Sequence, residues 1–273
     1  MATEFDLSRW KAKLRMRLGL EAAALLDYDK KRIRLGVSSA MEYHTRLHSC
    51  KKEPETIEWI ERSFSPGDVF YDVGANVGAY SLVAAAFWEG AVRVVAFEPS
   101  AANYARLVHN LALNGLERFV TPLPIALGEK TALATLHYAT LEAGGSLHVL
   151  NSTRDYRNVE FKPRMSCPTL VYDLDRLMEL FGLPPPTHLK LDVDGTELEI
   201  LRGAARTLRS VRSILVELEA GHPQTPAVTA LLEEQGFKAV AKHPYRYGKQ
   251  HPQFSGISNV IFSKTQTAAA VYR

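Results

Sequence analysis

Cysteine is scarce in this chain, and it has neither a long apolar run nor a strong net charge. The two cysteines, Cys50 and Cys167, lie far apart without the spacing of metal ligands, which indicates structural thiols in a reducing compartment. No apolar run is long enough to span a bilayer, and the N-terminus lacks the order of a signal peptide. A formal net charge of +3 gives no argument for nucleic acid. We therefore expect a cytoplasmic protein with no transmembrane segment and no nucleic-acid partner.

The overall composition is that of an ordinary globular protein. Of the 273 residues, 46% are hydrophobic and 23% are charged, which argues against disordered and fibrous classes. This length suits one large α/β domain, or one domain with an N-terminal extension. We favour the second division, with an extension over residues 1–52 and a main domain over residues 53–273.

The first thirty residues place large apolar side chains near helical spacing, with basic residues between them. The apolar positions are Trp10, Leu14, Leu18, Leu25 and Leu26. The pattern predicts a basic amphipathic helix. We expect its apolar face to lie on the main domain, although peripheral contact with an anionic membrane and packing on a partner subunit are alternatives.

From residue 69 onward the pattern alternates between strands and helices, as in a parallel sheet covered on both faces. We predict strands near 69–73, 93–98, 119–125, 188–192, 212–219, 237–242 and 257–263. We predict helices near 78–88, 101–114, 173–181, 196–208 and 226–236. The loop over 243–255 is too short in helical content for a parallel crossover, so the last strand is expected to be antiparallel. Residues 130–172 break the rhythm and predict a β-hairpin insertion over the active-site end of the sheet.

A glycine-rich loop follows the first of these strands. Gly74 and Gly78 allow positive φ angles and close approach of a ligand to the backbone, and the next helix points free N–H groups at the loop. About twenty residues later the second strand ends in Glu98, where a ribose-binding carboxylate is expected. The two features together predict a nucleotide-type cofactor site.

The spacing within the loop separates two cofactor classes. A dinucleotide loop needs Gly-x-Gly-x-x-Gly, whereas this chain has Asp72-x-Gly74-x-Asn76-x-Gly78, and asparagine also tolerates the left-handed region. The observed spacing is that of S-adenosylmethionine-dependent methyltransferases. An NAD-dependent oxidoreductase and a catalytically silent cofactor-binding or partner-binding module are the alternatives.

A second motif is His-Leu-Lys-Leu-Asp-Val-Asp-Gly-Thr-Glu-Leu-Glu-Ile-Leu-Arg-Gly-Ala at 188–204. Together with the loop at 72–81, Phe97-Glu98-Pro99, Asn110, Asn114 and Ile125-Ala-Leu-Gly128, it resembles the FkbM family of methyltransferases over about 53–263. The resemblance implies a Rossmann-like class I fold with a seven-stranded, mostly parallel sheet. It also implies methyl transfer from S-adenosyl-L-methionine to oxygen, commonly a hydroxyl of a sugar or polyketide. The segment at 52–60 resembles members from polysaccharide or glycoconjugate pathways.

The same resemblance implies cofactor-binding residues position by position. They are Asp72, Gly74, Asn76, Gly78, Glu98, Pro99, Ala126 and Asp192. The loop would cradle the methionine part, with Asp72 reaching the amino group, and Glu98 would accept from both ribose hydroxyls. Pro99 would line the adenine. Ala126 and Leu127 stand where many class I enzymes carry an acid, so adenine is expected to meet backbone groups and apolar side chains.

Two charged residues share one face of the strand predicted at 188–192. Lys190 and Asp192 are two positions apart, and an unpaired charge in a central strand would be costly. Glu217 and Glu219 share a face of the next strand, so a buried pair of Lys190 with Glu217 is expected. Because ligands bind outside the carboxyl ends of parallel strands, we predict that Asp192 or Lys190 orients or deprotonates the acceptor hydroxyl.

Other candidates complete the catalytic prediction, which comprises Asp192, Lys190, Glu219 and His222. His222 follows the strand at 212–219, and His148 follows a glycine turn in the insertion; either could act as a base near neutral pH. No metal site is predicted, because Asp192 and Asp194 alone lack the oxygen ligands that Mg²⁺ needs.

Two further patterns lie outside that catalytic set. Thr196 and Glu199 have the spacing of a capping box. The run Tyr245-Arg-Tyr247 suits stacking on a sugar and binding of an acidic group. We therefore expect a small-molecule or carbohydrate acceptor.

Overall fold

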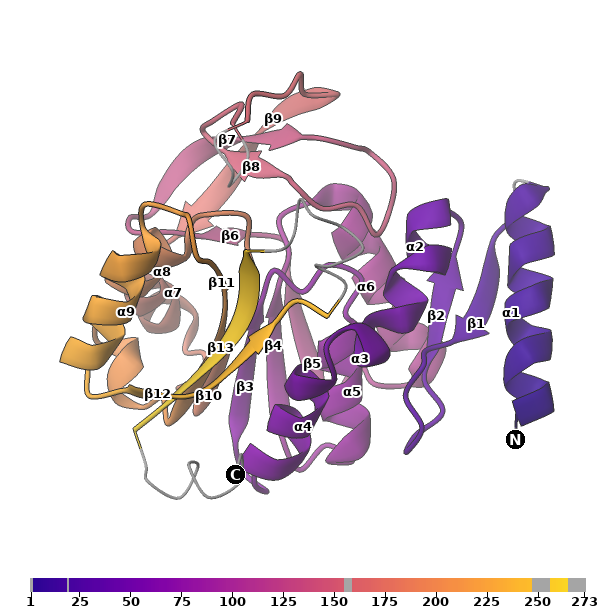
Figure 1. The fold of residues 1–273 in the computed structure, drawn as a ribbon, viewed down its shortest axis with the longest axis horizontal. Coiled ribbons are helices and arrows are strands. Elements are labelled where there is room, and N and C mark those ends of the chain that lie inside the picture. Colours follow the sequence, from indigo (N-terminus) through magenta and orange to yellow (C-terminus); the bar gives the residue numbers. More distant parts are fainter. Residues whose placement is uncertain (1, 19, 155–158, 247–255, 265–273) are drawn as a thin grey trace.

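A computed structural model describes residues 2–18, 20–154, 159–246 and 256–264, and a seven-stranded sheet forms its centre (Figure 1). In spatial order the strands are β12 (Lys238–Pro244), β13 (Ile257–Ser263), β11 (Ser213–Glu219), β10 (His188–Leu191), β3 (Val69–Val73), β4 (Arg93–Phe97) and β5 (Val120–Leu123). The strands from β11 to β5 run parallel, and β13 is antiparallel to both of its neighbours. The predicted Rossmann-like sheet with an antiparallel last strand is confirmed.

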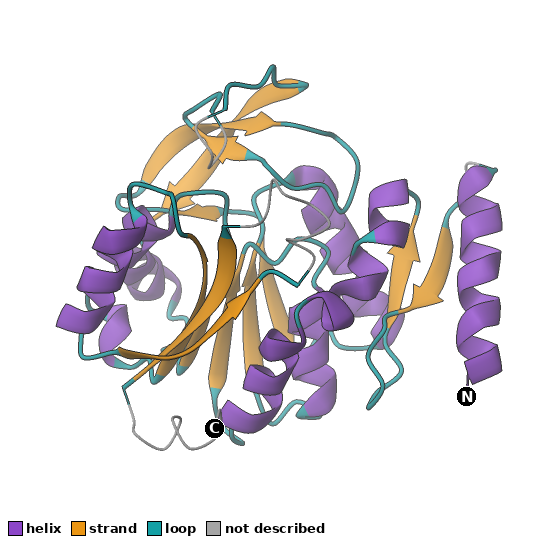
Figure 2. Ribbon diagram, in the orientation of Figure 1, coloured by secondary structure: helices purple, strands orange, loops and turns teal. Residues whose placement is uncertain are grey.

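Helices cover both faces of this sheet (Figure 2). One layer contains α4 (Pro54–Ser63), α5 (Ala79–Phe87) and α6 (Ala101–Asn114), and the other contains α7 (Leu174–Phe181), α8 (Glu197–Arg202) and α9 (Thr225–Glu234). The pleat of β3 shows why both layers are needed: Phe70 packs with side chains of the first layer, and Tyr71 packs with those of the second. Central strands buried on both faces are continuous apolar runs, which is why the sequence pattern located them.

Helix α8 is shorter than the predicted helix at 196–208. It ends at Arg202, and a 3₁₀ helix, η2 (Thr207–Arg209), follows. Gly203 lies so close to the neighbouring chain that a Cβ there would be 2.1 Å from the Gly128 carbonyl oxygen. Thr196 is the N-cap of α8, but its side chain makes no cap bond, and Glu199 accepts from the Gln224 side chain at 3.0 Å. The predicted capping box is therefore wrong.

The N-terminal segment departs most from the prediction. Helix α1 (Ala2–Arg17) ends well before residue 30, and β1 (Ala22–Leu25) then pairs antiparallel with β2 (Arg34–Val37). Leu25 and Leu26 therefore belong to a hairpin and its turn, because strand pairing satisfies the backbone there. Trp10 and Leu14 are exposed, at 61% and 45%, while the small Ala12 is buried. The expected apolar helix face on the main domain is thus wrong, and membrane or subunit contact stays a prediction.

Three short helical segments connect β2 to α4: α2 (Ala40–His44), η1 (Arg46–His48) and α3 (Ser49–Lys52). Helix α4 has Pro54 in its first turn, where a proline is well tolerated. Leu26, Leu35 and Leu47 belong to the same buried cluster as residues of α4 and α5. The N-terminal segment therefore shares one core with the sheet. Among the described residues, no helix is both long and apolar enough to cross a bilayer.

A second sheet lies over the carboxyl ends of the central strands, at the top of Figure 1. Its strands, in spatial order, are β6 (Ala126–Leu127), β9 (Met165–Tyr172), β7 (Ala132–Tyr138) and β8 (Val149–Leu150). The antiparallel pair of β7 and β9 is the predicted hairpin. Because β6 and β8 add to its two edges, the insertion is a four-stranded sheet and is larger than predicted.

Candidate active site

A cavity of about 440 Å³ opens where β3, β4 and β10 end, below the second sheet. This volume lies within the range of roughly 300–1,000 Å³ that small-molecule sites occupy. Its walls come from the ends of those strands, the glycine-rich loop, the second sheet with its loops, and the N-terminal segment. Four chain regions that are distant in sequence therefore meet around one space.

Two residues of the glycine-rich loop line this cavity as predicted. Gly74 has a φ of +80°, and a Cβ there would lie 2.0 Å from the backbone oxygen of Asp192, so only glycine fits between the ends of β3 and β10. Asn76 adopts a φ of 52°, and its backbone N–H donates to Glu98 at 2.8 Å. The loop thus joins the ends of β3, β4 and β10 into one wall.

Asp72 and Gly78 lie behind this wall and do not line the cavity. Asp72 is fully buried and accepts from the Ser81 hydroxyl at 2.6 Å, and burial raises the pKa of its carboxyl. Gly78 precedes α5 with a φ of +87°, and a Cβ there would lie 2.3 Å from a methyl group of Leu107 on α6. In the structure these two residues support the loop and the packing of its helix.

Glu98 presents a buried carboxyl group to the cavity. One oxygen accepts from the backbone N–H of Ser100 and the other from that of Asn76, both at 2.8 Å. Burial raises the pKa of Glu98 to about 7 in spite of these two hydrogen bonds. A carboxylate oxygen has a second lone pair, so Glu98 retains acceptor capacity for ligand hydroxyls. Pro99 lies beside it in the lining.

An apolar slot adjoins Glu98. Its lining residues come from β4, the β5–β6 region, the second sheet and α8: Phe97, Ile125, Ala126, Leu127, Leu136, Leu150 and Ile200. Ala126 lines the cavity, and its contact with adenine stays a prediction. A flat, weakly polar ring suits such walls better than a charged group, because burial of an unpaired charge is costly.

The glycine turn that the sequence predicted in the insertion closes the cavity from the second sheet; we call residues 143–147 the Gly144 loop. The Gly145 carbonyl accepts from the side-chain amides of Asn76, at 2.7 Å, and Asn103, at 3.0 Å. Asn103 also accepts from the Gly144 N–H, and the Leu147 N–H donates to Asp194 at 2.7 Å. The Gly144 loop is therefore bonded to the glycine-rich loop, to α6 and to the end of β10.

The N-terminal segment supplies the opposite wall, through Met41, Thr45, Arg46 and Lys52. A capping box between Ser39 and Glu42 starts α2, and the Ser39 hydroxyl also donates to the Ala143 carbonyl at 2.9 Å. The Ser-x-x-Glu spacing is a sequence signal that could have located this turn. Sequence reasoning missed the contribution of this segment to the cavity.

The charged residues of β10 pair differently from the prediction. The Lys190 ammonium group donates to Asp192 at 2.6 Å and lies 4.9 Å from the centre of the Tyr80 ring, so the expected pair of Lys190 with Glu217 is wrong. Burial alone lowers the pKa of Lys190, but the charges of Asp192 and Asp72 outweigh it and hold that pKa above its usual value. Lys190 therefore remains charged and is unsuited to deprotonate an acceptor.

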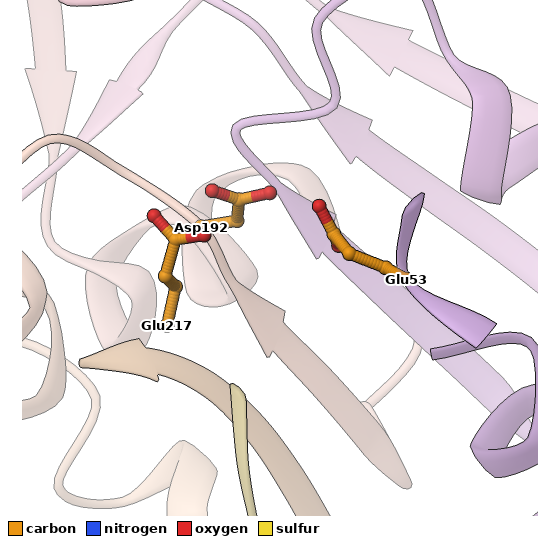
Figure 3. A group of neighbouring side chains, drawn as sticks. All are labelled: Glu53, Asp192 and Glu217. Carbon is orange, nitrogen blue, oxygen red and sulfur yellow. The ribbon is translucent and has the colours of Figure 1, made fainter. Parts of the chain in front are cut away.

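Three carboxyl groups meet beside this pair, and we call Glu53, Asp192 and Glu217 the carboxyl cluster. Figure 3 shows them turned toward one another, and one oxygen of each lies within 4.8 Å of the others. Lys52 pairs with Glu53 at 2.8 Å. Burial and the charge of Asp192 raise the pKa of Glu217 well above its usual value. For Asp192, burial raises the pKa, but the charges of Lys190 and Lys52 and the hydrogen bond from Lys190 together outweigh burial, so the pKa lies below its usual value.

The cluster therefore contains carboxyl groups with opposite pKa shifts. Asp192 and Glu53 are ionised partners of lysines, whereas Glu217 retains its proton more readily. Two groups whose environments separate their pKa values are a common arrangement for proton transfer. Three carboxylates can also hold a divalent cation, but two of these already neutralise lysines, and the prediction of no bound metal stays a prediction.

The remaining predicted residues divide between two cavities. Glu219 and His222 line a smaller cavity that shares Glu217 with the main one. His148 lines the main cavity, and both of its ring nitrogens are buried without a hydrogen-bond partner among the described residues. Burial lowers the pKa of His148 to about 4, so its imidazole is neutral near pH 7.

The tyrosine and arginine run before the last strand is only partly described. Tyr245 lines the main cavity, and its ring lies 5.3 Å from the Lys52 ammonium nitrogen. Arg246 donates to the Lys51 carbonyl at 2.9 Å. Tyr247 lies outside the described residues.

Comparison with known proteins adds a family match. The family model for the methyltransferase FkbM domain matches residues 72–239. The chain is 28% identical over 189 residues to the hexuronic acid methyltransferase AglP of Haloferax volcanii, covering 69% of this chain and 71% of that protein. It is 32% identical over 189 residues to the methyltransferase sdnD of Sordaria araneosa, covering 61% of this chain and 72% of that protein.

A solved structure is also similar. It is that of a methyltransferase FkbM from Methylobacillus flagellatus KT, with a TM-score of 0.49 and 18% identity. The match covers 73% of this chain and 44% of that chain, so this chain spans less than half the length of that protein. The family match rests on the sequence comparisons, and the matched segment includes the glycine-rich loop and the ends of β3, β4 and β10.

Proposed function

Because the chain belongs to the FkbM methyltransferase family, we propose that it transfers a methyl group from S-adenosyl-L-methionine to an oxygen of a carbohydrate-like acceptor. The observation that carries this proposal is the meeting of two chemistries in one cavity. Glu98 and the glycine-rich loop line this cavity, and so do Asp192 and Glu217 of the carboxyl cluster. The first suits a nucleoside, and the second suits an acceptor that must lose a proton.

The donor half fits S-adenosylmethionine through groups of this chain. The Glu98 carboxyl would accept hydrogen bonds from the two ribose hydroxyls, and the apolar slot around Ala126 would hold the adenine. Gly74 leaves the backbone free for close approach. When bound, the donor supplies a methyl group on a positively charged sulfur, which a nucleophilic oxygen can accept without a metal.

For the acceptor half we assign the proton to Glu217. The raised pKa makes the ionised carboxylate of Glu217 a stronger base than the carboxylate of Asp192, which pairs with Lys190. Lys190 and Asp192 then act by stabilising the end of β10 and by setting the electrostatic potential in the cavity. This refines the catalytic assignment made from the sequence, in which Asp192 or Lys190 was the base. Glu219 and His222, on the adjoining cavity, would contact more distant parts of a long acceptor.

A carbohydrate acceptor is supported by one relative, whose name states that it methylates a hexuronic acid. Tyr245 at the cavity edge provides an aromatic face of the kind that packs on sugar rings. We propose a hydroxyl of an oligosaccharide or glycoconjugate as the acceptor. The two cysteines are free, which supports a reducing, cytoplasmic location.

The test is methyl transfer from isotopically labelled S-adenosylmethionine to a panel of neutral and uronic-acid-containing oligosaccharides. We expect label in a carbohydrate, retained after mild alkali, because a methyl ether survives conditions that cleave a methyl ester. Label that alkali releases would move the acceptor from a hydroxyl to a carboxylate. Label confined to peptide or nucleic-acid controls would refute the carbohydrate assignment.

A further inference from the structure

Arg46 is a charged residue of the cavity wall that the proposed function leaves unused. It begins η1 in the N-terminal segment, before the part of the chain that the family model matches. Its Nε donates to the Gly144 carbonyl at 2.8 Å, so a contact between residues far apart in sequence fixes the guanidinium plane. Arg46 is half-buried and lines the cavity. A held guanidinium at a cavity wall is a preorganised anion-binding group.

The terminal amino groups of Arg46 are available for a ligand. Among the described residues, Nε carries the only hydrogen bond of this side chain, and Arg46 forms no ion pair. The other two cations near the cavity are already committed, because Lys190 pairs with Asp192 and Lys52 pairs with Glu53. Within the described part of the chain, Arg46 is therefore the cation of this cavity with unused donor groups.

The position of Arg46 favours the donor half of the cavity. Its anchor, the Gly144 loop, is bonded to Asn76 and Asn103, and Asn76 in turn donates to Glu98. Arg46 lines the same cavity as Glu98 and Asp192, and its charge lowers the pKa of both carboxyl groups. The methyl donor has one anionic group, the carboxylate of its methionine part. A guanidinium binds a carboxylate through two parallel hydrogen bonds.

We propose that Arg46 binds the carboxylate of the methyl donor, and that the Gly144 carbonyl positions its guanidinium for this contact. The proposal rests on the proposed function, since it assumes S-adenosylmethionine as the donor. It also gives the N-terminal segment a role: this segment completes a cofactor site whose other residues lie within the family domain. An acidic acceptor is the second possible source of a carboxylate, and the experiment separates the two sources.

The experiment combines substitutions of Arg46 with a ligand that lacks the amino-acid part of the donor. Calorimetric titrations compare S-adenosylhomocysteine with 5′-methylthioadenosine, which lacks the amino-acid part, on the wild type, Arg46→Met and Arg46→Lys. We expect Arg46→Met to weaken S-adenosylhomocysteine binding by about 10- to 100-fold and 5′-methylthioadenosine binding by less than about twofold. Arg46→Lys keeps the charge without the fork and should lie between. Arg62→Met, a change of an exposed arginine on α4, is the matched control.

These outcomes separate a failure of the Arg46 assignment from a failure of the proposed function. Equal weakening of both ligands by Arg46→Met would overturn the proposal, because it would mean that Arg46 acts only by holding the Gly144 loop. Unchanged binding of both ligands, with a higher KM for an acidic acceptor, would also overturn it and would move the carboxylate to the acceptor. A wild type that binds neither ligand would refute the proposed function itself. Retained 5′-methylthioadenosine binding in Arg46→Met shows that the variant is folded.

Discussion

The pKa of Glu98 leads to a quantitative prediction for donor binding. Burial raises this pKa to about 7 in the protein without ligand. Binding through both ribose hydroxyls requires acceptor oxygens, and protonation converts one of those oxygens into a donor. The bound state therefore favours the ionised carboxyl, and affinity must increase as the pH rises. For a group with a pKa of about 7, S-adenosylhomocysteine should bind about tenfold more weakly at pH 6 than at pH 8.

The assay is calorimetric titration with S-adenosylhomocysteine at pH 6, 7 and 8. Glu98→Gln should weaken binding at pH 8 and remove most of the pH dependence. His148 does not interfere, because its pKa of about 4 leaves it neutral throughout this range. A matched control is Glu129→Gln, a change of a half-exposed acid that pairs with Arg202 and lies outside the cavity lining. Full pH dependence in Glu98→Gln would refute the reasoning, since another group would then be the one that titrates.

The same raised pKa has the opposite effect on folding. The ionised form of Glu98 is disfavoured in the folded protein without ligand relative to the unfolded chain. Its contribution to stability is therefore complete below the usual pKa of 4.5 and is lost as the pH rises through about 7. Donor affinity should thus increase over the range in which this contribution to the unfolding free energy declines. Chemical denaturation of the wild type and Glu98→Gln across pH 5 to 8 measures that difference.

Three further predictions concern stability and turnover. Lys190→Met removes a fully buried cation from its ion pair with the partly exposed Asp192 and should lower the unfolding free energy by about 3–5 kcal/mol. A loss below about 1 kcal/mol in denaturant titration would contradict this. Glu217→Gln should reduce methyl transfer by about 10²- to 10⁴-fold with unchanged S-adenosylhomocysteine affinity. The control Glu234→Gln, on the exposed face of α9, should leave methyl transfer unchanged. Equal turnover of the two variants would exclude the base role. Gly78→Ala should be more destabilising than Gly67→Ala by about 1–3 kcal/mol. Both glycines have φ near +90°, but only Gly78 faces a neighbouring methyl group. Equal unfolding free energies of the two variants would show that the clash relaxes.

The sheet and the position of the glycine-rich loop could be predicted from the sequence because their signals are local. A continuous apolar run marks each central strand, and the Asp72 to Gly78 spacing marks a loop whose geometry its own residues determine. The segment over residues 1–30 had no such signal. Its alanine and leucine positions suit a helix or a strand equally, and only pairing with β2 decides between them.

The other half of the cavity depends on contacts between distant residues. Arg46 meets Gly144 across a separation of 98 residues, and Asn103 meets Gly144 across 41. No periodicity or spacing contains such information. Lys190 shows a second limit of prediction from sequence. The strand pattern placed it correctly on a central strand. Its flexible side chain, however, pairs with Asp192, directly after the end of the same strand, and not with Glu217 on the next strand. Placement on a strand follows from backbone geometry, whereas the choice of partner follows from side-chain packing.

The central claim is that this cavity binds S-adenosylmethionine, and parallel calorimetric titrations of the wild type with S-adenosylhomocysteine and NAD test it most directly. The account predicts saturable, one-site binding of S-adenosylhomocysteine that Glu98→Gln weakens, with no comparable heat from NAD. Tight binding of NAD without a response to S-adenosylhomocysteine would contradict it.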